Sequence, residues 1–235
     1  MTLLTVVQNA SRRLGLTTPS AVIGSSDATV IKLLGLSNQG GWELARRANW
    51  QALTKEKTFT SVAQESQTGA IPTDFDRIIN DTFFNRTRKR QVVGPLTPQQ
   101  WQAQKSIIAT VLYDSFRIRG DAILLLPTPP ASDTYAYEYI SSYWVDTDAD
   151  GDGDALAWEA DDDVALLDEE LLTLDLVWRF RQSNGLDYAE AFNTFEMQAA
   201  QVIARDGAKT LISMSNETSY DRPRYPGVQE GNWSL

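Results

Sequence analysis

The segment with the clearest potential for chemistry is an acidic run in which aspartates alternate with other residues. From position 146 to position 154, every second residue is an aspartate. Carboxylate oxygens are ligands that Ca²⁺ prefers, and this spacing lets one tight loop present several of them to a single ion. The residues predicted to bind calcium are the first four acids of the run, Asp146, Asp148, Asp150 and Asp152.

The acidic run matches the first half of an EF-hand loop but departs from the second half. In an EF-hand the twelfth position carries a glutamate that binds the ion through both oxygens. Here Ala157 occupies that position, Glu159 comes two residues late, and a predicted strand leads into the loop instead of a helix. The alternative is a solvated acidic turn between a strand and a helix. Weak calcium binding or none is therefore expected, and no other cofactor.

Two further groups of carboxylates, Asp161–Asp163 and Asp168–Glu170, could act as acid–base pairs. Acids are also favoured in the first turn of a helix, and an apolar-periodic run accompanies these residues. We therefore expect them to belong to the start of a helix and not to a catalytic site. The chain has no Cys and no His, which excludes thiol and imidazole catalysis and most zinc sites.

Basic residues are dense at one place in the chain. This basic cluster consists of Arg86, Arg88, Lys89 and Arg90. It could contact DNA phosphates, or it could form a solvated or salt-bridging face at a subunit contact. The formal net charge of −10 does not exclude a polyanionic partner, because residues 146–175 hold 13 of the 31 acids and no base.

The first part of the chain is predicted to be helical from the spacing of its apolar residues. A helical stripe over residues 3–14 is followed by Gly15, a typical C-cap residue. A second helix is expected from about Ala28 to Gly35, and Gly40–Gly41 is expected to interrupt it. A third run of helical spacing covers Trp42–Trp50, and its tryptophans are expected in the core.

The middle of the chain has the period of strands, and helical spacing returns after it. A hairpin is predicted over residues 115–126 with its turn at Gly120–Asp121, followed by a long strand over Asp133–Val145. Two amphipathic helices are then predicted on either side of the breaker Ser183–Gly185. Their apolar stripes include Leu171, Trp178, Phe192 and Phe195.

This order of elements predicts an α+β fold whose two ends join in one helical unit. N- and C-terminal helices pack as a helical bundle, with an inserted antiparallel β module and an extended C-terminal tail. The predicted domains are residues 1–56 with 160–208, residues 57–159, and the tail 209–235. No apolar stretch approaches the roughly 20 residues that span a bilayer, and the start lacks the features of a signal peptide. No membrane partner is therefore expected.

Several short segments, in their order and spacing, resemble the head-to-tail adaptors of tailed phages, in particular the tail tubular protein A and connector-ring group. The segments that carry the resemblance are Ala48–Leu53, Ala70–Ile78, Arg119–Pro127, Ala160–Asp163, Leu166–Leu172 and Trp178–Phe180. The resemblance implies a structural virion protein without catalytic activity. It implies a homo-oligomeric ring, a dodecamer, that docks on the portal protein and connects the capsid to a downstream tail or nozzle protein.

The resemblance also implies that the ring assembles in the host cytoplasm and that DNA passes through its channel without sequence-specific binding. The segment after Ala208 would dock on the portal. The residues expected to make that contact are Tyr220, Arg222, Arg224 and Tyr225. Two other classes of protein remain as alternatives: a carboxylate- or metal-dependent hydrolase acting on cell wall, and a calcium-binding adhesion module. A count of subunits would separate them from a ring.

Overall fold

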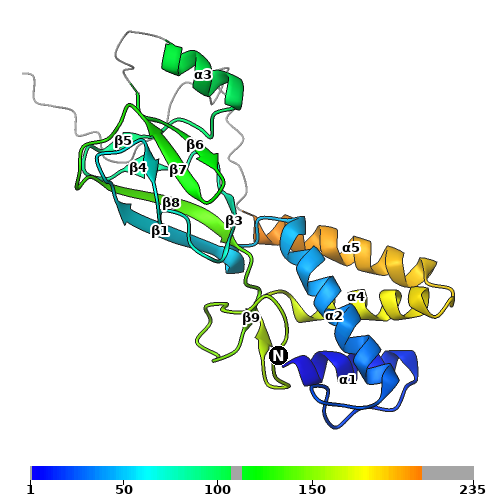
Figure 1. Ribbon diagram of the computed structural model, residues 1–235. Helices are drawn as coiled ribbons and strands as arrows, with labels where there is room; N and C mark the ends of the chain where they lie inside the picture. The colour runs from blue at the N-terminus through cyan, green and yellow to red at the C-terminus, as the bar shows by residue number, and fades with distance from the viewer. Residues whose placement is uncertain (1, 107–112, 208–235) are drawn as a thin grey trace, which may run out of the picture.

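The structure, a computed structural model, describes residues 2–106 and 113–207. Four of its helices gather at one end of the molecule, and most of its strands lie at the other (Figure 1). The helices are α1 (Leu3–Leu14), α2 (Ala28–Arg47), α3 (Pro98–Ser106), α4 (Glu169–Ser183) and α5 (Ala189–Asp206), with a 3₁₀ turn, η1, at Gln51–Leu53. The strands are β1 (Thr54–Thr60), β2 (Ser66–Gln67), β3 (Phe75–Ile78), β4 (Phe84–Asn85), β5 (Arg90–Gln91), β6 (Ser115–Arg119), β7 (Ala122–Leu126), β8 (Thr134–Ser141), β9 (Val145–Asp146) and β10 (Val164–Ala165). The α+β class predicted from the sequence is confirmed.

The helical end is built around α4, which contacts α1, α2 and α5. The α1 helix ends as predicted, because Gly15 adopts a left-handed conformation with φ of 69° and its N–H reaches back to carbonyls of the last turn. The helical hairpin of α4 and α5 is also present. Asp168 is the N-cap of α4, and its carboxylate accepts a hydrogen bond from the Leu171 N–H at 3.0 Å.

The β end consists of two antiparallel sheets that share one core. In the larger sheet β8 pairs with β1, β3 and β4, and β5 continues from β4; in the smaller sheet β7 lies between β2 and β6. Tyr135, Tyr137 and Tyr139 alternate along β8 and are buried with Phe83 and with residues of the β6–β7 hairpin. Because successive side chains of a strand point to opposite faces, this alternation places the tyrosines on the face that meets the smaller sheet.

The β6–β7 hairpin has the turn predicted for it, since Arg119 pairs with Ala122 and Gly120 has φ of 62°. The predicted strand Asp133–Val145 is wrong at its end, because β8 stops at Ser141. There the Ser141 hydroxyl and the Ser142 N–H both donate to Asp74, through its carboxylate and its backbone carbonyl. These hydrogen bonds take the place of further strand pairing by β8. The chain then bends, and the next strand, β9, begins at Val145.

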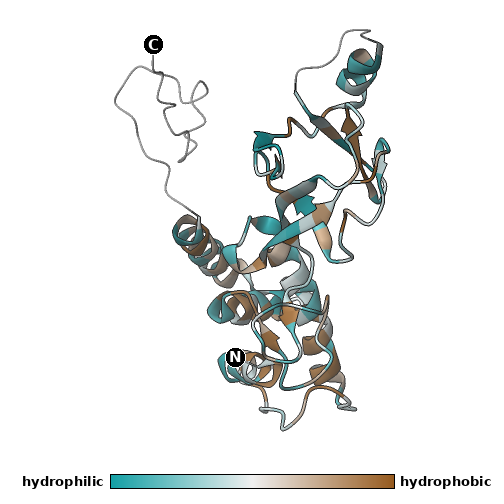
Figure 2. Cartoon of the chain, turned by 90° about the vertical axis from the view of Figure 1, so that its left-hand side faces the viewer, coloured by the Kyte–Doolittle hydropathy of each residue, from teal (hydrophilic) through white to brown (hydrophobic). Residues whose placement is uncertain are grey.

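The buried apolar residues form two separate clusters, and hydrophobic residues occur in both parts of the molecule (Figure 2). One cluster fills the β end. The other unites the helices and also takes in Trp144, Val145, Ala155 and Trp158, which follow β8. The predicted division into domains stays a prediction, but this cluster shows that the apolar residues that follow β8 pack with the helices.

The expected break at Gly40–Gly41 is wrong, because α2 runs without interruption through both glycines. Both are buried, and their lack of a side chain lets other elements approach the helix closely. A Cβ on Gly40 would overlap the Asp175 carboxylate of α4, and a Cβ on Gly41 would overlap the Trp144 ring. The continuous helix leaves Trp42 45% exposed with the Arg46 guanidinium over its ring, so its predicted place in the core is also wrong.

We therefore predict opposite effects for two glycine substitutions in α2. Gly41→Ala should lower the free energy of unfolding by about 1–3 kcal/mol, because the new methyl group must displace a fully buried indole. Gly35→Ala should raise it by about 0.5–1 kcal/mol, since nothing lies within 4 Å of the added Cβ and alanine favours a helix. Urea unfolding of both variants would measure this difference. Equal effects at the two positions would contradict the close packing at Gly41.

Among the residues that the structure describes, no helix has the length and apolarity that crossing a lipid bilayer requires.

Candidate functional site

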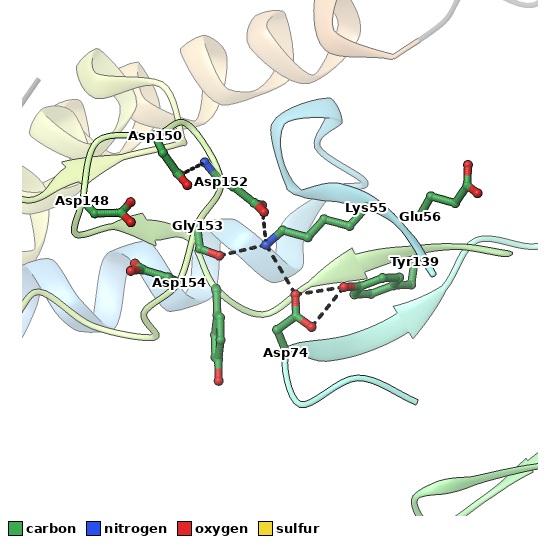
Figure 3. A pocket seen from close by; sticks show the side chains of 10 residues that line it. Lys55, Glu56, Asp74, Tyr139, Asp148, Asp150, Asp152, Gly153 and Asp154 are labelled. Atoms are coloured by element: carbon green, nitrogen blue, oxygen red, sulfur yellow. Dashed lines mark hydrogen bonds and ion pairs between the residues drawn. The ribbon is translucent and has the colours of Figure 1, made fainter. Parts of the chain in front are cut away.

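The candidate site is an open pocket of about 630 Å³ between the β9–β10 loop and the first strand of the larger sheet (Figure 3). It lies where the helical end meets the β end. Its lining is polar and mostly acidic. The residues around it are Lys55, Glu56, Asp74, Tyr139, Tyr143, Asp148, Asp150, Asp152, Gly153 and Asp154.

Lys55 of β1 is the cation of this pocket and binds the acidic loop to the sheet. Its Nζ lies 2.5 Å from an Asp152 carboxylate oxygen and 3.6 Å from an oxygen of Asp74 (Figure 3). It also donates a hydrogen bond of 2.8 Å to the Gly153 carbonyl. Three groups, two from the loop and one that precedes β3, therefore share one ammonium group, in line with the three donors that lysine offers.

Asp74 is the buried end of this network. The Tyr139 hydroxyl lies 3.0 Å from both of its carboxylate oxygens, and the Ser141 hydroxyl donates to one of them at 2.8 Å. Burial raises the pKa of Tyr139, and the nearby Asp74 carboxylate raises it further. The phenol therefore keeps its proton at neutral pH and remains a donor to Asp74.

The structure brings together three of the four aspartates predicted to bind a metal. Asp146, Asp148 and Asp150 each place a carboxylate oxygen within 4.8 Å of the others. Asp152 does not join them, because it turns toward Lys55. Three of the four predicted aspartates therefore form a triad at the start of the loop, and calcium binding by them stays a prediction.

The last acid of the run, Asp154, has a structural partner. Its carboxylate accepts hydrogen bonds from the Thr147 N–H at 3.0 Å and from the Thr147 hydroxyl at 2.6 Å. These bonds stabilise the charged form and lower the pKa of Asp154. They also close the acidic run into a turn, because they join Thr147 near its start to Asp154 at its end.

Of the two acidic groups expected at the start of a helix, Asp168–Glu170 lies there, whereas the prediction is wrong for Asp161–Asp163. The α4 helix begins at Glu169 with Asp168 as its cap. Asp161 instead accepts the backbone N–H groups of Val22 and Ile23, the latter at 2.7 Å. Asp163 accepts those of Glu159 and Ala160, at 2.6 and 2.8 Å. Each carboxylate holds a loop in place through the backbone donors it accepts.

The basic cluster lies at the turn between β4 and β5 and is partly neutralised within the chain. Arg86 forms an ion pair with Glu56 at 2.7 Å, and Arg88 forms one with the buried Asp133 at 2.8 Å. Lys89 occupies a left-handed position in the turn, with φ of 55°, and Arg90 begins β5. The two ion pairs fix part of this cluster against the sheet, and contact with phosphate stays a prediction. The residues predicted to dock on the portal, Tyr220, Arg222, Arg224 and Tyr225, lie outside the described residues.

Lys55 and Asp74 are the residues of this site that the sequence did not predict. Asp74 belongs to the segment Ala70–Ile78, one of those that carry the resemblance to phage adaptors, but the pattern gave no role for its side chain. Lys55 is one of several polar residues in β1, and no local signal marks it. Its role follows from the pairing of Lys55 with Tyr139 in the sheet, which brings it beside Asp74.

Comparison with known proteins gives a family for almost the whole chain. The sequence model of the SU10 adaptor protein family matches residues 1–227. A comparison with curated proteins gave no match. The family is one of phage head-to-tail adaptors, so the resemblance to such adaptors is confirmed, whereas the likeness to the tail tubular protein A group stays a prediction. Its members are structural proteins, and membership implies a component of the virion. The extent of the match shows that this chain belongs to the SU10 adaptor protein family.

Proposed function

We propose that this protein forms a ring, a dodecamer, that docks on the portal and connects the capsid to the next protein of the tail. The match of residues 1–227 to a family of phage adaptors is the observation that carries the proposal. The ring assembles in the host cytoplasm, stays in the virion and leaves a channel through which DNA passes without sequence-specific binding.

The architecture supports a role in assembly. The helical end combines helices from both ends of the described chain, and the β end projects from it (Figure 1). Such a subunit can pack through one end while the other end faces a different partner. The arrangement gives no support to a hydrolase that uses these acids as an acid–base pair, because Asp161, Asp163 and Asp168 each accept backbone N–H groups of a loop or of a helix start.

The ring can be tested by counting subunits. Native mass spectrometry of the purified protein, alone and mixed with its portal, would give the mass of each assembly. We expect twelve copies bound to the portal, and electron microscopy of the mixture should show a ring on one face of it. A chain that stays a monomer or dimer in the presence of the portal would contradict the proposal and favour the enzyme or adhesion alternatives.

We predict that portal binding depends on the C-terminal segment. Deleting Ser215–Leu235 should remove binding to the portal, because the arginines and tyrosines proposed to make the contact are lost. The deletion should leave the melting temperature unchanged, since every buried residue that the two clusters contain within 2–106 and 113–207 precedes it. Pull-down and thermal unfolding of the truncated protein would measure the two effects.

Two point variants sharpen this test. Arg222→Ala combined with Arg224→Ala should weaken binding, whereas Arg119→Ala, an exposed position on the β6–β7 hairpin, should not. Portal binding by the truncated protein at unchanged affinity would show that another surface makes the contact.

A further inference from the structure

The aspartate triad of the β9–β10 loop combines residues of very different exposure. Asp148 and Asp150 are exposed, whereas Asp146 is 3% exposed although it carries a carboxylate. A buried carboxylate is unfavourable unless its oxygens are hydrogen-bonded, paired with a cation or bound to a metal. Whether the two carboxylate oxygens of Asp146 have hydrogen-bond partners therefore indicates whether a metal ion can bind here.

One oxygen of Asp146 has a partner and the other does not. Oδ2 accepts a hydrogen bond of 2.8 Å from the Gly151 N–H. Oδ1 is shielded from solvent, and no donor among residues 2–106 and 113–207 forms a hydrogen bond with it. An unsatisfied buried acceptor is unfavourable for the fold, and each one calls for an explanation such as a bound ion. This observation is independent of the number of acids in the loop.

The charge around the triad also favours a cation. Carboxylate oxygens of Asp146, Asp148 and Asp150 lie within 4.8 Å of one another, so their negative charges repel unless a cation lies between them. Lys55, which lines the same pocket, is held by Asp152, Asp74 and the Gly153 carbonyl. Three acids therefore remain crowded at the start of the loop with the neighbouring ammonium group engaged elsewhere.

We propose that Asp146, Asp148 and Asp150 bind a calcium ion, with the buried Oδ1 of Asp146 as one of its ligands. Calcium accepts six to eight oxygen ligands in flexible geometry, so backbone carbonyls and waters can complete its shell in an irregular loop. Magnesium demands near-ideal octahedral geometry and gives up its waters reluctantly, so an irregular loop suits it less. Because the bidentate glutamate of an EF-hand is replaced by Ala157, we expect a dissociation constant between about 0.1 and 1 mM.

The proposed ion would act on the junction between the two ends of the molecule. The triad opens the same loop whose later residues, Asp152 and Gly153, bind Lys55 of β1. An ion that fixes the start of the loop would also hold these two groups in place against the sheet. Calcium would then stiffen the contact between the helical end and the β end, a property that does not depend on ring formation.

The test uses the full chain, with calcium, magnesium and sodium chlorides compared at equal ionic strength. Isothermal titration calorimetry should give a calcium-specific heat. At a calcium concentration about tenfold above the dissociation constant, the melting temperature should rise by about 3–6 °C. The combined substitution Asp148→Asn and Asp150→Asn should abolish both effects, and these positions are exposed, so the variant should still fold.

Asp152→Asn is the matched control within the same loop. It removes the ion pair with Lys55 but no proposed ligand, so the calcium-dependent rise should persist from a lower starting temperature. A rise of equal size with magnesium, no rise with any ion, or a rise that survives the double substitution would each overturn the proposal.

Discussion

Replacing Trp178 with alanine should lower the free energy of unfolding by about 3–5 kcal/mol, the loss typical of a large aromatic residue removed from a core. Trp178 lies in α4 and is 8% exposed. Its ring meets Phe192 edge to face, with 5.1 Å between ring centroids, and also packs against Phe195 at 6.1 Å. The indole N–H donates to the Asp175 carboxylate at 3.0 Å, and that bond is lost as well.

Two substitutions in α5 set the scale for this result. Phe192→Ala should lower the free energy of unfolding by less than Trp178→Ala does, because Phe192 is only partly buried. A loss of about 3–5 kcal/mol is expected only where the aromatic side chain is fully buried. Met197→Ala should change the free energy of unfolding by no more than about 0.5 kcal/mol, since Met197 is 64% exposed. Urea unfolding followed by circular dichroism at 222 nm would measure all three. A Trp178→Ala protein as stable as the wild type would contradict the packing of the helical hairpin.

The elements that the sequence predicted well are those whose cause is local. The α1 helix and the α4–α5 hairpin have apolar stripes at helical spacing, and glycine or a polar breaker ends them within a few residues. The β6–β7 hairpin has a two-residue turn that contains Gly120. In each case the residues that determine the structure are neighbours in the chain, so their pattern is visible without knowledge of the fold.

The predictions that were wrong depend on contacts between distant segments. Gly40–Gly41 has the local pattern of a helix break, yet the glycines are needed because Asp175 and Trp144 lie against the helix. Asp161 has the local pattern of a helix start, yet its carboxylate holds the loop at Val22 and Ile23. No spacing in the sequence records either contact, because each joins residues more than 100 positions apart.

The candidate site shows the same division. Alternating aspartates predicted that several carboxylates share one loop, and Asp146, Asp148 and Asp150 do so. Which aspartates of the run cluster together was not predictable, because Asp152 instead forms an ion pair with Lys55, a residue of β1. The burial of Asp146 is equally a property of the packed molecule. Local spacing thus predicted the chemistry of the site, and the tertiary contacts determined which residues take part.

The second large effect is expected at Arg179, which forms a buried ion pair with Asp175 within α4 and a second ion pair with the half-exposed Glu43 of α2. Arg179 donates to Asp175, which is 1% exposed, at 2.6 Å, and to Glu43 at 2.6 Å. Arg179→Met keeps much of the length and apolar volume of the side chain but removes its charge. The Asp175 carboxylate would then be buried without a cation, and breaking such a pair from one side costs about 3–5 kcal/mol. The neutral substitution Asp175→Asn should recover part of the loss when combined with Arg179→Met.

This loss should depend on pH in a direction that the burial of Asp175 determines. Burial already raises the pKa of Asp175 above its ordinary value of 3.8, against the opposing effect of Arg179. Without Arg179 the folded-state pKa rises further, so the folded protein binds a proton at pH values where the unfolded chain has released it. Stability therefore increases as the pH falls from above the raised pKa toward 3.8. The difference in unfolding free energy between Arg179→Met and the double variant should shrink over that range, because the asparagine side chain of the double variant does not titrate. A difference that stays constant from pH 7 to about pH 4 would show that Asp175 is not left as a buried charge when Arg179 is removed.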